Sequence, residues 1–203
     1  MSIRNLIEKN EIINKYILIL TTILFIFLEI HALSLNSHFK YDLIMTLILL
    51  VFVFVIRRGI HLHWFHYLLF TFFLTGHNLG MYQLYDKFPL GIEYDYWVHG
   101  YFGVVSTMVI FRAITCRRVI TDANTIIFLT IIMVLGISAI HELYEYAGAV
   151  LLGEGEGVLF IGAGDIDEWD TQKDMLNNLI GSIIGLIAYI GYVNFKKVLK
   201  NKS

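Results

Sequence analysis

The chain has 203 residues, of which 57% are hydrophobic and 16% are charged, and its mean hydropathy is +0.68. A soluble domain carries about 25% charged residues, so this composition excludes an ordinary soluble protein and predicts an integral membrane protein. The formal net charge of −2 argues against a nucleic-acid partner and leaves membrane lipids as the expected partners. A single cysteine, Cys116, cannot form an internal disulfide.

Six apolar runs follow one another along the chain, and each can cross a hydrocarbon core of about 30 Å. We therefore expect an all-α fold, in which residues 1–203 form one transmembrane domain with a bundle of six helices. A β-barrel would need short alternating strands instead of continuous apolar runs. The expected spans are 16–35, 41–56, 62–83, 94–113, 125–152 and 175–195.

The segments outside these spans differ in character. The first 15 residues are amphiphilic and suggest a short helix at the membrane interface. The first four connections are short, which favours antiparallel neighbours. The last connection, 153–172, is rich in glycine and acidic residues, and we expect an irregular loop there.

Basic residues predict the orientation of the bundle. Of the 15 lysines and arginines, 12 fall on one side of the six-span topology and 3 on the other. By the positive-inside rule, both termini are expected in the cytoplasm. The three outer basic residues are Lys40, Lys87 and Lys173.

With this orientation, polar groups of five spans fall at one level, near the outer leaflet. Ionisable groups at membrane depth are expensive, so they usually have partners and a function. The groups are Glu29 and His31 in the first span, His77 and Asn78 in the third, Asp95 and His99 in the fourth, His141, Glu142 and Glu145 in the fifth, and Asp174, Asn177 and Asn178 in the sixth.

Helical spacing places several of these groups on shared faces. Asp95 and His99 are four residues apart, as are His141 and Glu145, while Glu142 precedes Glu145 by three. Together with Asp174, these spans carry four carboxylates that cannot all be ionised without compensation. Protonation, pairing with protonated histidines, or a bound cation would provide it.

A divalent metal such as zinc is one candidate ligand of this cluster, because histidine and carboxylate groups are typical zinc ligands. The alternatives are a structural hydrogen-bond network between helices and a proton relay. The sequence His141-Glu-Leu-Tyr-Glu145 differs from the H-E-x-x-H zinc-protease motif at its last position. The candidate metal ligands are Asp95, His99, His141, Glu142, Glu145 and Asp174, with Asp170, Asn178 and His77 as supporting residues.

Two further features of the sixth span have structural interpretations. Asp170 and Asp174 can cap the start of the helix, where carboxylates complement the helix dipole. Gly181 and Gly185 form a G-x-x-x-G pattern, which lets another helix approach closely.

Three segments together resemble the YjdF-like family of bacterial inner-membrane proteins, namely 94–103, 142–146 and 170–181. Their D-x-x-x-H, E-x-x-E and D-x-x-x-N-x-x-G order is more loosely similar to VanZ-like membrane proteins. The resemblance covers residues 41–191, implies the same topology and supplies no reaction. It marks as motif positions Asp95, His99, Glu142, Glu145, Asp170, Asp174 and Asn178.

The first functional hypothesis is a membrane enzyme or binding protein that acts on a lipid or envelope-linked molecule at the outer leaflet. Metal-bound water near Glu142 or Glu145 would be the nucleophile, and His99 or His141 the acid or base. The cluster contains no serine or cysteine nucleophile. Two alternatives stay open: a small proton-coupled transporter, and a non-catalytic envelope or scaffold protein.

Overall fold

The computed structural model describes residues 3–34, 42–84, 87–118, 120–152 and 169–202, and all the regular secondary structure in them is helical. The six described α-helices are α1 (Ile3–Ser34), α2 (Asp42–Ile56), α3 (Trp64–Leu79), α4 (Tyr94–Arg117), α5 (Ala123–Leu152) and α6 (Asp170–Lys202). A π-helical turn, Gly80–Leu84, extends α3, and a 3-10 turn, Pro89–Gly91, precedes α4.

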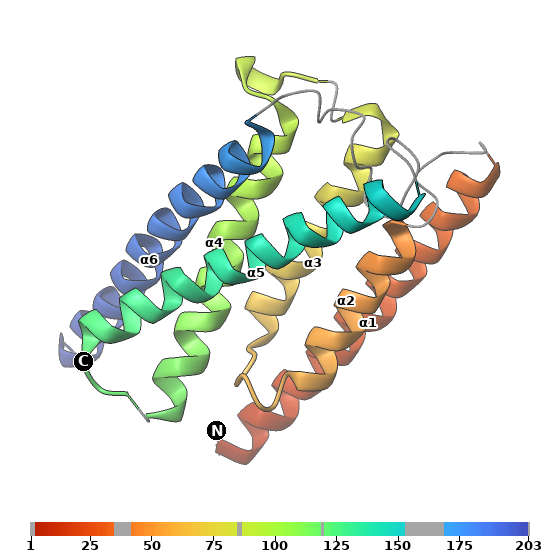
Figure 1. Ribbon diagram of the computed structural model, residues 1–203. Helices are drawn as coiled ribbons and strands as arrows, with labels where there is room; N and C mark the ends of the chain where they lie inside the picture. The colour runs from red at the N-terminus through yellow and green to blue at the C-terminus, as the bar shows by residue number, and fades with distance from the viewer. Residues whose placement is uncertain (1–2, 35–41, 85–86, 119, 153–168, 203) are drawn as a thin grey trace.

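The helices form two groups of three (Figure 1). In the first group α1, α2 and α3 contact one another, and in the second α4 contacts both α5 and α6, which also contact each other. The groups join where α3 packs against α4. Successive helices alternate in direction, so the start of α1 and the end of α6 lie at the same end of the bundle (Figure 1).

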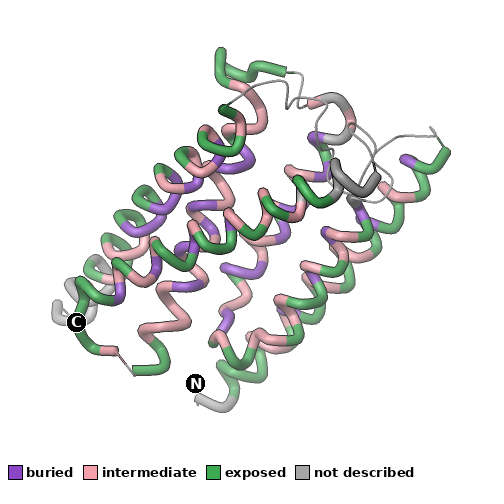
Figure 2. Tube along the Cα trace, viewed as in Figure 1, coloured by how far each residue is buried: buried purple, intermediate pink, exposed green. Residues whose placement is uncertain are grey.

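Four of the described helices are long and apolar enough to cross a membrane, namely α1, α4, α5 and α6. The apolar segment Leu43–Ile56 of α2 is shorter. Figure 2 shows buried residues where helices face one another and exposed residues on the outer faces. Large apolar side chains are among those exposed, such as Ile19 and Phe27 of α1, as expected for helices surrounded by lipid. The all-α fold is confirmed, with four helices long and apolar enough to cross a membrane, while the number of crossings and the cytoplasmic location of the termini stay predictions.

Several helices extend beyond the predicted spans. α1 is continuous from Ile3, so the segment that we expected as a separate interfacial helix is the first part of α1. α6 begins at Asp170 and takes up the last residues of the predicted loop; residues 153–168 of that loop lie outside the described part. Helices extend in this way because propagation adds one hydrogen bond per residue, and proline is absent from both segments.

Glycines bring α4 and α6 into backbone contact. A Cβ atom added to Gly181 would collide with the carbonyl group of Gly100, and one on Gly103 would collide with the carbonyl oxygen of Asn178. A Cβ on Gly185 would lie 2.8 Å from an α4 carbonyl oxygen. The close helix approach predicted from the G-x-x-x-G pattern is therefore confirmed, and α4 supplies glycines of its own.

We predict that Gly181→Ala lowers the free energy of unfolding by about 1–3 kcal/mol, because its methyl group would force α6 away from α4. Unfolding in mixed detergent and dodecyl sulfate micelles measures this change. Gly191→Ala is the matched control on the same helix, since no atom lies within 4 Å of the added Cβ. Equal stability of the two variants would contradict the packing described here.

The predicted orientation can be tested at two exposed positions near opposite ends of α4. Cys116 is exposed near its end, and Leu90, just before its start, is 91% exposed. In intact bacterial cells, a membrane-impermeant maleimide should react with Leu90→Cys in a Cys116→Ser background but not with the native Cys116. Labelling of native Cys116 in intact cells would show that the orientation is the opposite of the predicted one.

Candidate functional site

His99 is the centre of a buried polar cluster among α3, α4, α5 and α6. It lies one helical turn after Asp95 on α4, and its side chain is only 10% exposed. One oxygen of Asp95 lies 3.6 Å from His99 Nε2. The i,i+4 spacing makes this pair a local consequence of the sequence.

α6 supplies a group for each nitrogen of the His99 ring. Asp174 Oδ2 lies 3.6 Å from His99 Nε2, on the side where Asp95 also approaches. Asn178 Nδ2 lies 3.1 Å from His99 Nδ1. Asp174 is 3% exposed and Asn178 is 1% exposed, so water has little access to either. The backbone contact between α4 and α6 brings these four side chains together.

α5 forms the third wall of the cluster. Its Ser138 Oγ accepts a hydrogen bond of 2.6 Å from Asn178 Nδ2. The ring of His141 lies 6.0 Å from that of His99, measured between centroids. The ring of His141 also lies 6.4 Å from that of His77 of α3, again measured between centroids. The cluster therefore contains three histidines from three helices.

Asp174 has several acidic neighbours. Asp95, Asp170 and Glu142 all lie close enough to interact with it electrostatically. Asp170 is in the first turn of α6, as predicted. Because neighbouring negative charges must be compensated in a buried site, this arrangement favours either a shared proton or a bound cation.

Three groups have the geometry of a metal site. One ligand atom each from Asp95, His99 and Asp174 lie within 4.8 Å of one another. The two N···O separations of 3.6 Å are too long for hydrogen bonds. Zinc bonds of 2.0–2.1 Å in a tetrahedron separate neighbouring ligand atoms by about 3.4 Å. The two separations from His99 Nε2 are therefore close to the spacing of zinc ligands.

The structure does not gather every sequence-predicted group in one place. Glu29 lies close enough to Tyr82 to interact with it electrostatically, and the His31 ring is 5.5 Å from the Tyr82 ring. Tyr82 in turn donates a hydrogen bond of 2.8 Å to the Leu28 carbonyl oxygen. The first span thus contributes to a second polar group, formed with the π-helical turn after α3.

Two further predicted residues have different outcomes. Asn78, which follows His77 in the sequence, is buried. Its amide atoms have no hydrogen-bond partner among the described residues. Glu145 belongs to α5, but its side chain lies outside the described residues.

Ser138 is a site residue that the sequence reasoning missed, although it lies one turn before Glu142 and thus on the same helix face.

Comparisons with known proteins place the chain among membrane proteins. Residues 13–195 match a family described as predicted membrane protein (DUF2238). The inner membrane protein YjdF of Escherichia coli (strain K12) is 29% identical over an alignment of 120 residues, and the match covers 54% of this chain and 56% of that protein. The match thus spans little more than half the length of this curated relative. No solved structure matches the chain.

Proposed function

The chain belongs to the DUF2238 family of predicted membrane proteins, in keeping with its YjdF-like motifs, and we propose that it binds a divalent cation inside the membrane bundle. The proposed ligands are Asp95, His99 and Asp174. Zinc is the best match, because imidazole and carboxylate ligands are typical of its sites. The observation that carries the proposal is the convergence of these three ligand atoms within 4.8 Å.

The charges around Asp174 support a cation over a purely structural hydrogen-bond network. The neighbours that interact electrostatically with Asp174 are acidic, and Asp174 itself is 3% exposed. A cation would offset the repulsion between these carboxylates.

Three protein ligands would leave the fourth position of tetrahedral zinc to water, as in catalytic rather than structural zinc sites. Glu142 lies near Asp174 and would accept the proton of that water. The proposed reaction class is metal-assisted hydrolysis of a lipid or envelope-linked molecule. Its location at the outer leaflet rests on the distribution of basic residues. The looser likeness to VanZ-like proteins stays a prediction and carries none of this argument.

A proton-coupled carrier is the second candidate, and the group of three histidines favours it. The ring of His141 lies 6.4 Å from that of His77 and 6.0 Å from that of His99. Histidine is suited to proton transfer near neutral pH. This candidate predicts a pH-dependent flux through proteoliposomes that His141→Phe abolishes.

We predict that the purified protein holds about one zinc ion per chain, removable with a chelator. Returning zinc to the stripped protein should raise its melting temperature, because a ligand present at 100 times its Kd adds about 2.7 kcal/mol of stability. His99→Ala and Asp174→Asn should lose both the metal and the stabilisation. Elemental analysis and thermal unfolding in detergent measure the two effects.

His31→Ala is the control for this experiment, since His31 is exposed and belongs to the second polar group. It should keep the metal. If folded wild-type protein neither contains zinc nor gains stability from added zinc, cobalt or manganese, the metal proposal is wrong.

Asn178 is the proposed positioning residue of the metal site. Since His99 Nε2 faces the carboxylates, a metal there requires the proton on Nδ1, which then needs an acceptor. Asn178 Oδ1 has no hydrogen-bond partner among the described residues. Rotating the amide by 180° would bring this oxygen to His99 Nδ1, where Ser138 can donate to it as well.

We predict that Asn178→Leu weakens zinc binding about 10- to 100-fold, since it removes the acceptor that orients His99. Asn178→Asp should retain binding, because a carboxylate is an acceptor in either orientation. Competition with a fluorescent zinc chelator measures both affinities. Equal loss in the two variants would show that the amide acts through its donor group, contrary to this role.

A further inference from the structure

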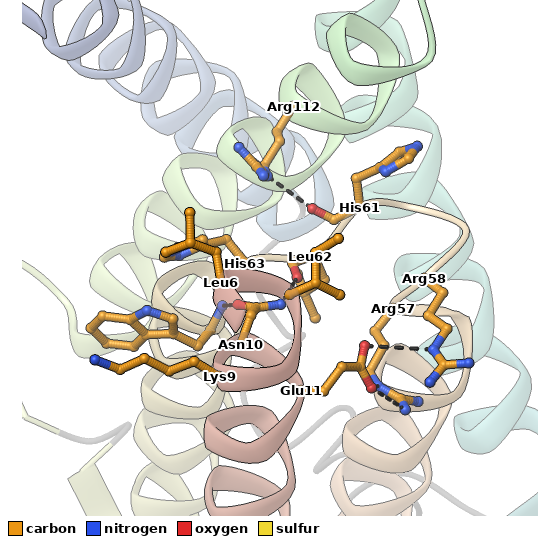
Figure 3. Close-up of a pocket in the computed structure, with 12 residues that line it drawn as sticks. Leu6, Lys9, Asn10, Glu11, Arg57, Arg58, His61, Leu62, His63 and Arg112 are labelled. Carbon is orange, nitrogen blue, oxygen red and sulfur yellow. Dashed lines mark hydrogen bonds and ion pairs between the residues drawn. The ribbon is translucent and has the colours of Figure 1, made fainter. Parts of the chain in front are cut away.

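A hollow of about 650 Å³ lies at the opposite end of the bundle, where the chain begins. It forms where the start of α1, the connection from α2 to α3 and the last part of α4 meet (Figure 3). Four cationic side chains line it against a single carboxylate, Glu11. Its apolar lining consists of Leu6, Ile7, Leu62 and Trp64.

Arg57 serves the architecture of this hollow. Its Nε and Nη2 atoms donate hydrogen bonds of 3.0 and 2.7 Å to one oxygen of Glu11, and Nη1 donates to the Phe54 carbonyl oxygen. The guanidinium group also stacks on the Phe54 ring at 3.9 Å. Arg57 thus neutralises the one carboxylate of the lining and joins α1 to α2.

The remaining cations retain capacity for an anion. Arg112 donates through Nε to the His61 carbonyl oxygen at 2.8 Å, which orients its guanidinium group and leaves the two Nη groups for a ligand. Arg58 is 77% exposed and lies 3.6 Å from Glu11. Lys9 contributes an ammonium group from α1. Figure 3 shows Arg112 and Arg58 on different sides of the hollow.

The connection between α2 and α3 is held in a defined shape. Asn10 of α1 donates to the Leu62 carbonyl oxygen and accepts from the Trp64 backbone N–H, at 3.1 and 2.7 Å. His61 has a φ of 50°, in the left-handed region that residues other than glycine rarely adopt. Its carbonyl group is the one that Arg112 binds. Such strain persists where surrounding contacts enforce it and is common in binding sites.

We propose that this hollow binds the phosphate headgroup of an anionic phospholipid. Arginine side chains match phosphate oxygens with paired N–H donors, and lysine adds a point charge. The opening lies at the helix ends, where headgroups lie in a bilayer. Basic pockets between helices on the cytoplasmic side are typical sites for anionic headgroups, and the basic residues predict this side to be cytoplasmic.

The apolar lining favours a lipid over a free phosphate ion. Leu6 and Ile7 are exposed at the start of α1, beside the cationic groups of the same hollow. They can contact the glycerol and upper acyl chain of the lipid while the phosphate meets the guanidinium groups. A free phosphate ion would gain nothing from these side chains.

The proposal can be tested by titrating phosphatidylglycerol or phosphatidylcholine into the full chain in neutral detergent micelles. Thermal unfolding and native mass spectrometry serve as the readouts. Phosphatidylglycerol should stabilise the protein and remain bound as a single molecule, unlike phosphatidylcholine. The double variant R58Q/R112Q should bind phosphatidylglycerol roughly 25-fold more weakly, at about fivefold for each charge near the membrane surface.

Arg118→Gln removes one charge from the same end but outside the hollow, and it should retain wild-type affinity. A loss in Arg118→Gln as large as in the double variant would overturn the proposal, because binding would then follow overall surface charge. Equal binding of both lipids would overturn it as well. Displacement of phosphatidylglycerol by millimolar inorganic phosphate would assign the hollow to a soluble anion instead of a lipid.

Discussion

Backbone contact between α4 and α6 is the constraint on which the candidate site depends. Inside a membrane, lipid tails are as apolar as helix surfaces, so helices associate through close packing and polar contacts rather than by escaping water. Gly103 and Gly181 leave no side chain between the two backbones. Only at this separation can His99 on one helix reach Asp174 and Asn178 on the other. The glycines that allow the close helix contact and the polar side chains of the candidate site therefore lie in the same few turns of α4 and α6.

The cluster concentrates negative charge where charge is least tolerated. Asp174 is 3% exposed, and its acidic neighbours Asp95, Asp170 and Glu142 come from three helices. The start of α6 offsets part of this cost, because the positive end of the helix dipole favours carboxylates in the first turns. A cation among Asp95, His99 and Asp174 would offset more of it. Protons shared among the carboxylates and histidines would also compensate this negative charge, which is why a proton-coupled carrier is the second candidate function.

The two ends of the bundle have opposite chemical character. One end holds buried acids and histidines, and the other gathers arginines and lysines around a hollow with an apolar wall. They share α4, which carries Asp95 and His99 near its start and Arg112 near its end. The proposed metal site and the proposed lipid site are thus separated by most of the length of this helix, and each can be lost without the other.

Local patterns in the sequence were enough to predict the helices, the shared face of Asp95 and His99 and one close helix contact. Apolar runs determine helices because every backbone group in a membrane must be hydrogen-bonded within the segment. Spacing alone predicted that Asp95 and His99 share a face, and G-x-x-x-G predicted a close helix contact. These features depend on residues within a few turns of one helix, so no knowledge of the partner helix was needed.

Tertiary structure decided which helices meet and how each is rotated. It placed Ser138 against Asn178, and it directed His31 toward Tyr82 rather than toward His99. It also assembled the basic hollow from three segments that are distant in the sequence. Helix rotation and neighbours follow from the side-chain packing of all six helices together, and neither apolar periodicity nor i,i+4 spacing contains that information.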